Sequence, residues 1–156
     1  GTRRIDVRTA AQMREAALAN LPGQDMFIGV AAVADYRPAK ASLQKIKKGS
    51  GSFTLMLEPT ADILAEIAAQ PDAPLCVGFA AESHDLATYA ESKRVSKKLA
   101  LVVGNLVQDG LGTDTNRVIL FDASGAHPLP LADKTDVARG IVAHLVALLE
   151  KRNANS

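Results

Sequence analysis

Three lysines within four positions are the first group of side chains that could do chemistry. Lys45, Lys47 and Lys48 are followed at once by the Gly/Ser run 49–52. Ammonium groups this close repel one another unless they are solvated or face an anion, and a Gly/Ser run lets a loop close over a ligand. A triphosphate would satisfy the charge, as lysine does in other phosphate sites. The alternative, a solvated basic loop, stays open, because most charge runs face solvent.

Asp35 is a carboxylate placed directly after the almost continuously apolar run Met26–Ala34. Such a run predicts a strand that is covered on both faces. A carboxylate at its end could hold a ribose hydroxyl, a base amine or a metal-bound phosphate. The alternative is a turn carboxylate that accepts hydrogen bonds from neighbouring backbone N–H groups.

Lys93 and Lys97 lie four residues apart in a predicted helix and therefore share one face of it. Like charges at this spacing mildly destabilise a helix, and an anionic ligand would offset the repulsion. Cations near the end of a helix also complement its dipole, so the pair has a purely structural interpretation as well.

Two further features could contribute to a binding site. Phe79 ends the apolar run 75–80 and could stack on a base, although a phenylalanine at such a position is more often part of the core. Thr60 is expected to cap a helix over 61–69, and the free N–H groups of a helix start favour anions or polar base edges. Most helix starts, however, bind nothing.

The elements that must position these residues alternate between strands and helices. This alternation predicts an α/β fold with a mainly parallel sheet and an antiparallel hairpin edge. Ligands of such sheets bind outside the carboxyl ends of the strands, which places Asp35, Phe79 and Asn105 on one rim. Strands are expected at 26–34, 53–57, 75–80, 100–104, 117–121 and 127–131, with a short one at 4–7, and helices at 10–21, 61–69, 85–99 and from 133 onward.

Composition narrows the classes of protein. A chain of 156 residues with a net charge of +1 suits one domain and has no global field for nucleic acid or membrane. Tryptophan is absent and aromatic residues make up 4%, which argues against stacking on single-stranded nucleic acid. The lone Cys76 allows no disulfide within the chain. The absence of a long apolar stretch or a secretory signal favours a cytoplasmic location, with no membrane or nucleic-acid partner.

The histidines of this chain do not predict a metal site. His84, His127 and His144 are scattered and show no ligand spacing, so they are interpreted as structural or surface residues. We therefore expect no metal ligands among the side chains of this chain.

Taken together and in order, these blocks resemble the bacterial phosphopantothenate–cysteine ligases (phosphopantothenoylcysteine synthetases). The resemblance covers nearly the whole chain, and the first two blocks in succession are its most specific part. The matching blocks are Ala31–Arg37, Lys45–Lys48, Asp62–Ile63, Val77–Glu82 and the helix from Lys93 to Lys97 with Asn105 beyond it.

The resemblance implies a Rossmann-like three-layer fold and a role in coenzyme A biosynthesis. CTP would activate the carboxylate of 4′-phosphopantothenate as an acyl cytidylate with release of pyrophosphate, and the amine of cysteine would then displace CMP, with Mg²⁺ assisting. Lys45 would be catalytic and would also contact the nucleotide. The other implied nucleotide-binding residues are Gly29, Val30, Ala31, Asp35, Ala61, Asp62, Ile63, Leu64, Phe79, Lys93 and Lys97.

The resemblance also implies partners and exposes two departures. The family forms homodimers and is usually joined to a phosphopantothenoylcysteine decarboxylase domain. No segment here matches the Gly-Pro-Thr turn and the Asn/Ser/Gly-rich stretch with which the family's ligase domain begins. Residues 1–156 are therefore expected to be a single domain, the C-terminal two-thirds of a CTP-dependent ligase domain, without part of the family's catalytic apparatus. The family's Asn-Pro-Asp run appears as Thr60-Ala-Asp62.

Two other functions remain under consideration. A non-catalytic nucleotide-binding or dimerisation module would share the same residues without the chemistry. An NAD(P)-binding domain is disfavoured, because the chain has no GxGxxG turn.

Overall fold

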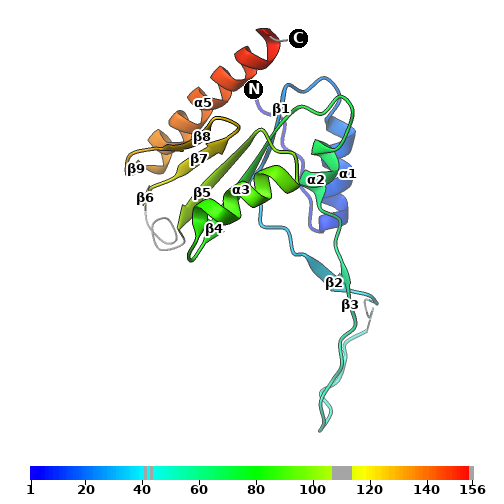
Figure 1. The fold of residues 1–156 in the computed structure, drawn as a ribbon. Helices are drawn as coiled ribbons and strands as arrows, with labels where there is room; N and C mark the ends of the chain where they lie inside the picture. The colour runs from blue at the N-terminus through cyan, green and yellow to red at the C-terminus, as the bar shows by residue number, and fades with distance from the viewer. Residues whose placement is uncertain (41, 43, 107–113, 155–156) are drawn as a thin grey trace.

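A five-stranded mixed sheet forms the centre of the computed structural model, which describes residues 1–40, 42, 44–106 and 114–154 (Figure 1). The strand order is β1-β4-β5-β7-β8; β1, β4 and β5 are parallel, and β7 and β8 are antiparallel to their neighbours. This confirms the predicted α/β class with a parallel centre and a hairpin edge. The bounds are Met26–Gly29 for β1, Leu75–Glu82 for β4, Leu101–Leu106 for β5, Ile119–Asp122 for β7 and Gly125–Pro128 for β8.

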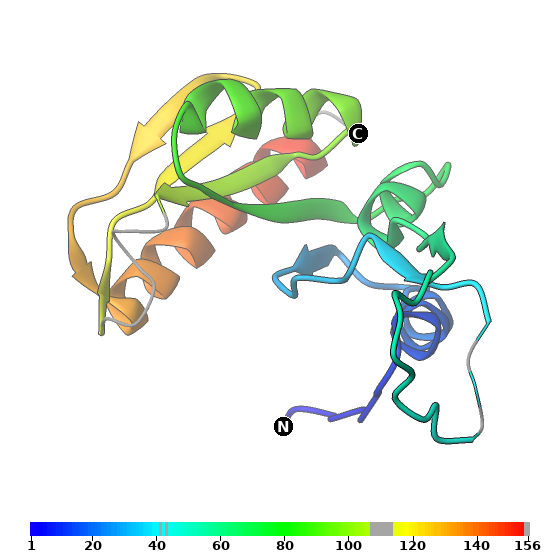
Figure 2. The same cartoon turned by 90° about the horizontal axis from the view of Figure 1, so that it is seen from below.

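Helices cover the two faces of this sheet and complete three layers (Figures 1 and 2). On one face, α2 (Ile63–Ala68) and α3 (Leu86–Ser96) share a core with Cys76, Ala80 and Val102. On the other face, α5 (Lys134–Ala154) packs Val137, Ile141 and Leu145 against β4, β5 and β7. Helix α1 (Ala10–Asn20) lies beyond α2, at the β1 edge. No described helix is both long enough and apolar enough to pass through a bilayer.

Local chemistry explains the ends of two helices. Thr9 accepts a hydrogen bond from the backbone N–H of Gln12, whose side chain in turn accepts from the N–H of Thr9, so α1 begins with a capping box. At the start of α5, the carboxylate of Asp133 accepts from the N–H of Asp136. The expected starts of both helices are thereby confirmed.

The strand expected at 26–34 ends early, at Gly29. Strand β1 pairs only with β4 and forms an edge of the sheet as described, so Ile28 is 44% and Val30 62% exposed rather than buried on both faces. The continuous apolar run therefore predicted too long a strand. Residues 30–34 leave the sheet and pass along its rim.

The described residues between 36 and 59 form a segment that we call the arm, where the sequence predicted a loop followed by a strand at 53–57. Strand β2 (Tyr36–Pro38) pairs antiparallel with β3 (Leu57–Pro59), and the chain projects from the body beyond them (Figure 1). The strand expected at 53–57 is thus displaced toward the arm's base. A second small ribbon joins β6 (Thr115–Asn116) to β9 (Ala132–Asp133).

Other predicted boundaries also change. Residues 4–7 form no strand. The hairpin strand lies at Gly125–Pro128 rather than 127–131, because the turn at Ala123–Ser124 is closed by Gly125, whose φ of 126° suits a residue without a side chain. The sequence also predicts a polar, Gly-rich loop at 105–116, of which residues 107–113 lie outside the described part.

Candidate functional site

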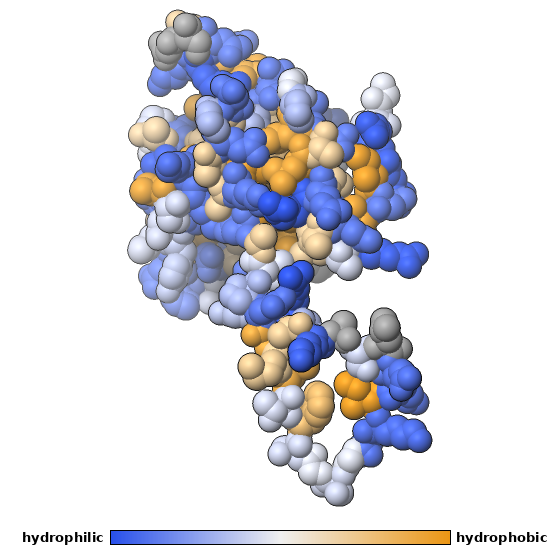
Figure 3. Space-filling view, turned by 90° about the vertical axis from the view of Figure 1, so that its right-hand side faces the viewer, coloured by the Kyte–Doolittle hydropathy of each residue, from blue (hydrophilic) through white to orange (hydrophobic). Residues whose placement is uncertain are grey.

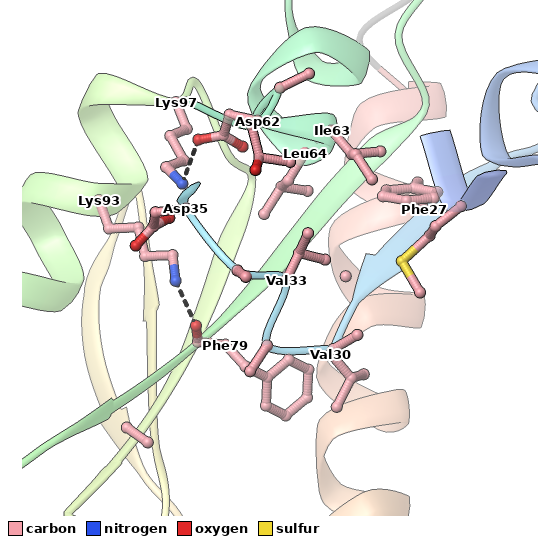
Figure 4. A pocket seen from close by; sticks show the side chains of 18 of the residues that line it. Phe27, Val30, Val33, Asp35, Asp62, Ile63, Leu64, Phe79, Lys93 and Lys97 are labelled. Atoms are coloured by element: carbon pink, nitrogen blue, oxygen red, sulfur yellow. Dashed lines mark hydrogen bonds and ion pairs between the residues drawn. The ribbon is translucent and has the colours of Figure 1, made fainter. Parts of the chain in front are cut away.

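A cavity of about 310 Å³ opens at the carboxyl ends of β1, β4 and β5 (Figure 4). Of the twelve residues expected to bind a nucleotide, eleven line it, contributed by the loop after β1, the start of α2, the end of β4 and one face of α3. These eleven are Gly29, Val30, Ala31, Asp35, Ala61, Asp62, Ile63, Leu64, Phe79, Lys93 and Lys97. The sequence therefore located a real cavity, while its occupant stays a prediction.

One backbone hydrogen bond joins two walls of the cavity. The N–H of Thr60 donates to the carbonyl oxygen of Asp35 at 2.8 Å. This bond fixes the end of the loop after β1, residues 30–35, which we call the rim loop, beside the start of α2. Below them, Leu64 packs against β1 at Gly29, where an added Cβ would lie 3.5 Å from Leu64 Cδ1, an ordinary contact distance. The rim loop thereby rests on a packed base.

Lys93 crosses the cavity from α3 to β4. Its Nζ donates to the carbonyl oxygen of Phe79 at 2.6 Å (Figure 4). Burial, reinforced by the neighbouring charge of Lys97, lowers the pKa of the Lys93 ammonium. The result is a half-buried cation held by a single backbone oxygen.

Lys97 and Asp62 form the second polar pair of the cavity. Lys97 Nζ lies 2.6 Å from Asp62 Oδ2, and Asp62 Oδ1 accepts from the N–H of Ala65 at 3.0 Å. Burial alone would raise the pKa of the Asp62 carboxyl, but the Lys97 and Ala65 hydrogen bonds outweigh it, so the pKa lies below its ordinary value.

This arrangement corrects two expectations about the start of α2. The cap is Asp62 and the helix begins at Ile63, so Thr60 does not cap it. An N–H group of the first turn, that of Ala65, is already taken by Asp62 rather than left for a ligand. The hydroxyl of Thr60 is instead buried, with no partner among the described residues.

The carboxylate of Asp35 completes the charge pattern. It lines the cavity and, among the described residues, makes no side-chain hydrogen bond or ion pair. The cavity thus presents two ammonium groups, two carboxylates and an aromatic wall. Such a set can bind a polar ligand that carries both anionic and donor groups.

Lys45 is the one predicted site residue that does not line the cavity. It lies exposed on the arm, as do Lys47 and Lys48. The catalytic role of Lys45 stays a prediction.

Several lining residues were not assigned by sequence. Phe27 and Val33 belong to the apolar run that was interpreted as a buried strand, and Met13 comes from α1. Asn105 was placed on the rim but given no role. Met13 reaches the cavity only because α1 packs beside α2.

Comparison with known proteins supports the family suggested by the sequence. Residues 1–149 match the family model described as the DNA/pantothenate metabolism flavoprotein C-terminal domain. The coenzyme A biosynthesis bifunctional protein CoaBC of Vibrio cholerae is 41% identical over 152 residues, which cover 94% of this chain and 38% of that protein. CoaBC of Bacillus subtilis is 40% identical over 156 residues, covering 97% and 38%. The chain thus spans about two-fifths of the length of these relatives.

Solved structures are also similar to this chain. A crystal structure of the C-terminal domain of CoaBC superposes with a TM-score of 0.77 at 33% identity, over 94% of this chain and 66% of that one. At 20% identity, the Cab2 H337A mutant in complex with phosphopantothenate-cysteine has a TM-score of 0.62, a likeness of fold alone. The resemblance drawn from the sequence motifs is confirmed. The chain belongs to the family of DNA/pantothenate metabolism flavoprotein C-terminal domains.

Proposed function

We propose that this chain is the nucleotide-binding part of a phosphopantothenate–cysteine ligase of coenzyme A biosynthesis that uses CTP. The observation that carries the proposal is the cavity itself, since eleven residues expected at a nucleotide from the family motifs line one pocket. Relatives that are 41% and 40% identical to this chain are named coenzyme A biosynthesis bifunctional proteins.

Three residues that line the cavity would have roles in this reaction. Lys93 and Lys97 would neutralise negative charge on the phosphates, and Phe79 would contact the base or ribose. Catalysis would rest on positioning the carboxylate of 4′-phosphopantothenate against the α-phosphate, from which pyrophosphate leaves, and on stabilising charge that develops there. The amine of cysteine then attacks the acyl cytidylate and CMP leaves.

Mg²⁺ fits this cavity through Asp35. The ion is usually bound by one or two carboxylates together with substrate phosphates, and the Asp35 carboxylate is uncommitted among the described side chains. When bound, Mg²⁺ would reduce the charge of the triphosphate. Asp62 is less suited, because its two oxygens already bind Lys97 and Ala65.

The arm supports two parts of the proposal. Lys45 would reach the triphosphate by movement of the arm, for which the Gly/Ser run 49–52 provides freedom. The arm also exposes large apolar side chains, which favours a homodimer in which a second copy covers them (Figure 3). They are Ile46, Phe53, Leu55, Met56 and Leu57.

A non-catalytic nucleotide-binding module is the second candidate, favoured by the position of Lys45 outside the cavity. In either case we infer a physical link to a phosphopantothenoylcysteine decarboxylase domain, as the bifunctional relatives suggest.

Two measurements test the proposal. Calorimetric titration of this chain with CTP and Mg²⁺, against ATP and NADPH, should show selective binding of CTP. A chimera that joins the preceding ligase-domain residues of the Vibrio cholerae relative to this chain should form phosphopantothenoylcysteine and release pyrophosphate. CTP binding without product in the chimera would favour the non-catalytic module, and equal binding of all three nucleotides would contradict the proposed specificity.

A further inference from the structure

Asp122, His127 and His144 meet at the end of the sheet opposite the cavity. They come from β7, β8 and α5, and their ligand atoms all lie within 4.8 Å of one another. In the register of the sheet, Phe121 faces Val102 near the start of β5, whereas the cavity lies at the other end of that strand. The cluster is therefore separate from the proposed nucleotide site. The histidines that look scattered in the sequence are brought together by the fold, with 4.9 Å between the centroids of His127 and His144.

The carboxylate at the centre is buried and held in place. Asp122 is 4% exposed. Its Oδ1 accepts from the N–H and the hydroxyl of Ser124 at 2.7 and 2.6 Å and lies 3.1 Å from His127 Nε2. Its Oδ2 lies 2.8 Å from His144 Nε2. Hydrogen bonds from outside a metal site that fix a carboxylate in this way are typical of metal ligands.

The ion-pair contacts of this carboxylate, among the described residues, are with the two histidines. Arg94 contributes from a distance, but its guanidinium is bound to both oxygens of Glu91. A divalent cation at the cluster would lie directly against the carboxylate charge.

The geometry points to a site for a divalent transition-metal ion, with Zn²⁺ the best match, bound by Asp122, His127 and His144; we propose this site. Tetrahedral zinc places its ligand atoms about 3.3 Å apart, given bonds of about 2.0 Å, and the two Asp–His distances of 3.1 and 2.8 Å are close to this value. Two imidazoles and one carboxylate suit zinc, whereas Mg²⁺ and Ca²⁺ prefer oxygen ligands alone. The side chain of His127 is 40% exposed, which leaves access for the ion and for a water ligand.

The bound ion would fasten the β7–β8 hairpin to α5. The histidine ring nitrogens that now face the carboxylate would turn to the metal, and Ser124 would keep the carboxylate oriented. The competing interpretation is that the histidines simply hydrogen-bond to Asp122. The two interpretations differ in whether the chain retains metal.

The test is a Zn²⁺ titration of the full chain by calorimetry with the variants His127→Gln, His144→Gln and His84→Gln. His84 is the matched control, because it is an exposed histidine that contacts Ser83 and Tyr89, away from the cluster. We expect one Zn²⁺ per chain, bound at least about tenfold more weakly by each cluster variant and unchanged in His84→Gln. Zinc should also raise the melting temperature of the unaltered chain and of His84→Gln only.

A second measurement keeps the proposal testable if a cluster variant does not fold. Histidine ring signals of the unaltered chain, followed by nuclear magnetic resonance during zinc addition, should show two shifted rings and one unshifted ring. The His84→Gln spectrum identifies the unshifted ring. The absence of zinc binding, binding retained by both cluster variants, or equal shifts of all three rings would each overturn the proposal.

Discussion

The ammonium nitrogen of Lys93 lies 2.6 Å from the carbonyl oxygen of Phe79, so that helix α3 is tied to strand β4 inside the cavity. Among the described residues this contact is the one hydrogen bond of the half-buried cation, which an ammonium group can supplement with two further N–H donations to a ligand. An anionic ligand that bound to Lys93 would therefore interact with a cation that folding has already partly removed from water.

Replacing Lys93 by Met keeps the apolar stem and removes this charge. Since a hydrogen bond to a charged group contributes about 1.5–3 kcal/mol, we expect CTP to bind about tenfold or more weakly. Calorimetry measures the change, and Lys98→Met, an exposed lysine just after the same helix, is the control. Equal affinities for Lys93→Met and the unaltered chain would remove Lys93 from the proposed site.

The proposed role of Lys45 predicts a loss of turnover. In the chimera described above, Lys45→Gln should lower kcat by roughly a hundredfold, the usual effect of removing one group that stabilises transition-state charge. Lys48→Gln, three positions along the same exposed arm, should change kcat little. If both variants have the same kcat, the arm acts only as a general basic surface.

Gly78 is required by packing on β4. A Cβ there would lie 2.9 Å from Leu99 Cδ1 and 3.0 Å from Leu64 Cδ2, so Gly78→Ala should destabilise the fold by about 1–3 kcal/mol. Gly51→Ala, where no atom lies within 4 Å of an added Cβ, should stay within about 0.5 kcal/mol. Urea unfolding of the two variants measures the difference, and equal midpoints would contradict the packing argument.

The lowered pKa of Asp62 predicts an acid-dependent contribution to stability. Because the folded pKa lies below the unfolded value, the contribution is complete above the unfolded pKa and is lost as pH falls through the folded pKa. Asp62→Asn keeps a capping side chain but should be less stable at pH 7, by under about 1 kcal/mol, since the Asp62 side chain is 46% exposed. The deficit should vanish toward pH 2 in unfolding curves, and a constant deficit would assign it to packing instead. Asp72→Asn, an exposed carboxylate in the turn after α2, is the control.

The exposed apolar arm predicts concentration-dependent association. Phe53 and Met56 are 69% and 72% exposed, and replacing both by Ser should shift a dimer toward monomer in sedimentation velocity experiments. Val95→Ser, on α3, removes an exposed apolar side chain of similar exposure and should leave the assembly unchanged. A chain that is monomeric at all accessible concentrations would contradict the proposed homodimer.

Sequence patterns located the cavity because it depends on local features. Asp35 comes after β1, and Phe79 and Asn105 lie in the C-terminal halves of β4 and β5. The carboxyl ends of parallel strands meet on one rim whatever the details of packing. Lys93 and Lys97 share a face through helical spacing alone.

What the sequence did not reveal depends on tertiary contacts. The length of β1 depends on its edge position, which no apolar run encodes. Asp122, His127 and His144 come together only because the hairpin folds back and α5 crosses the sheet. The position of Lys45 relative to the cavity depends on how the arm extends from its base, and its spacing from Asp35 carries no such information.

The hydrogen bond from Thr60 to Asp35 joins the two points at which the chain leaves the pocket and returns to it. Everything between them is an excursion whose ends are held at a fixed separation by the pocket itself. The entropy of closing such a loop rises only slowly with its length. Insertions and deletions in the arm should therefore be tolerated during evolution with little effect on the pocket, so that reach and partner choice can diverge while ligand recognition is inherited unchanged.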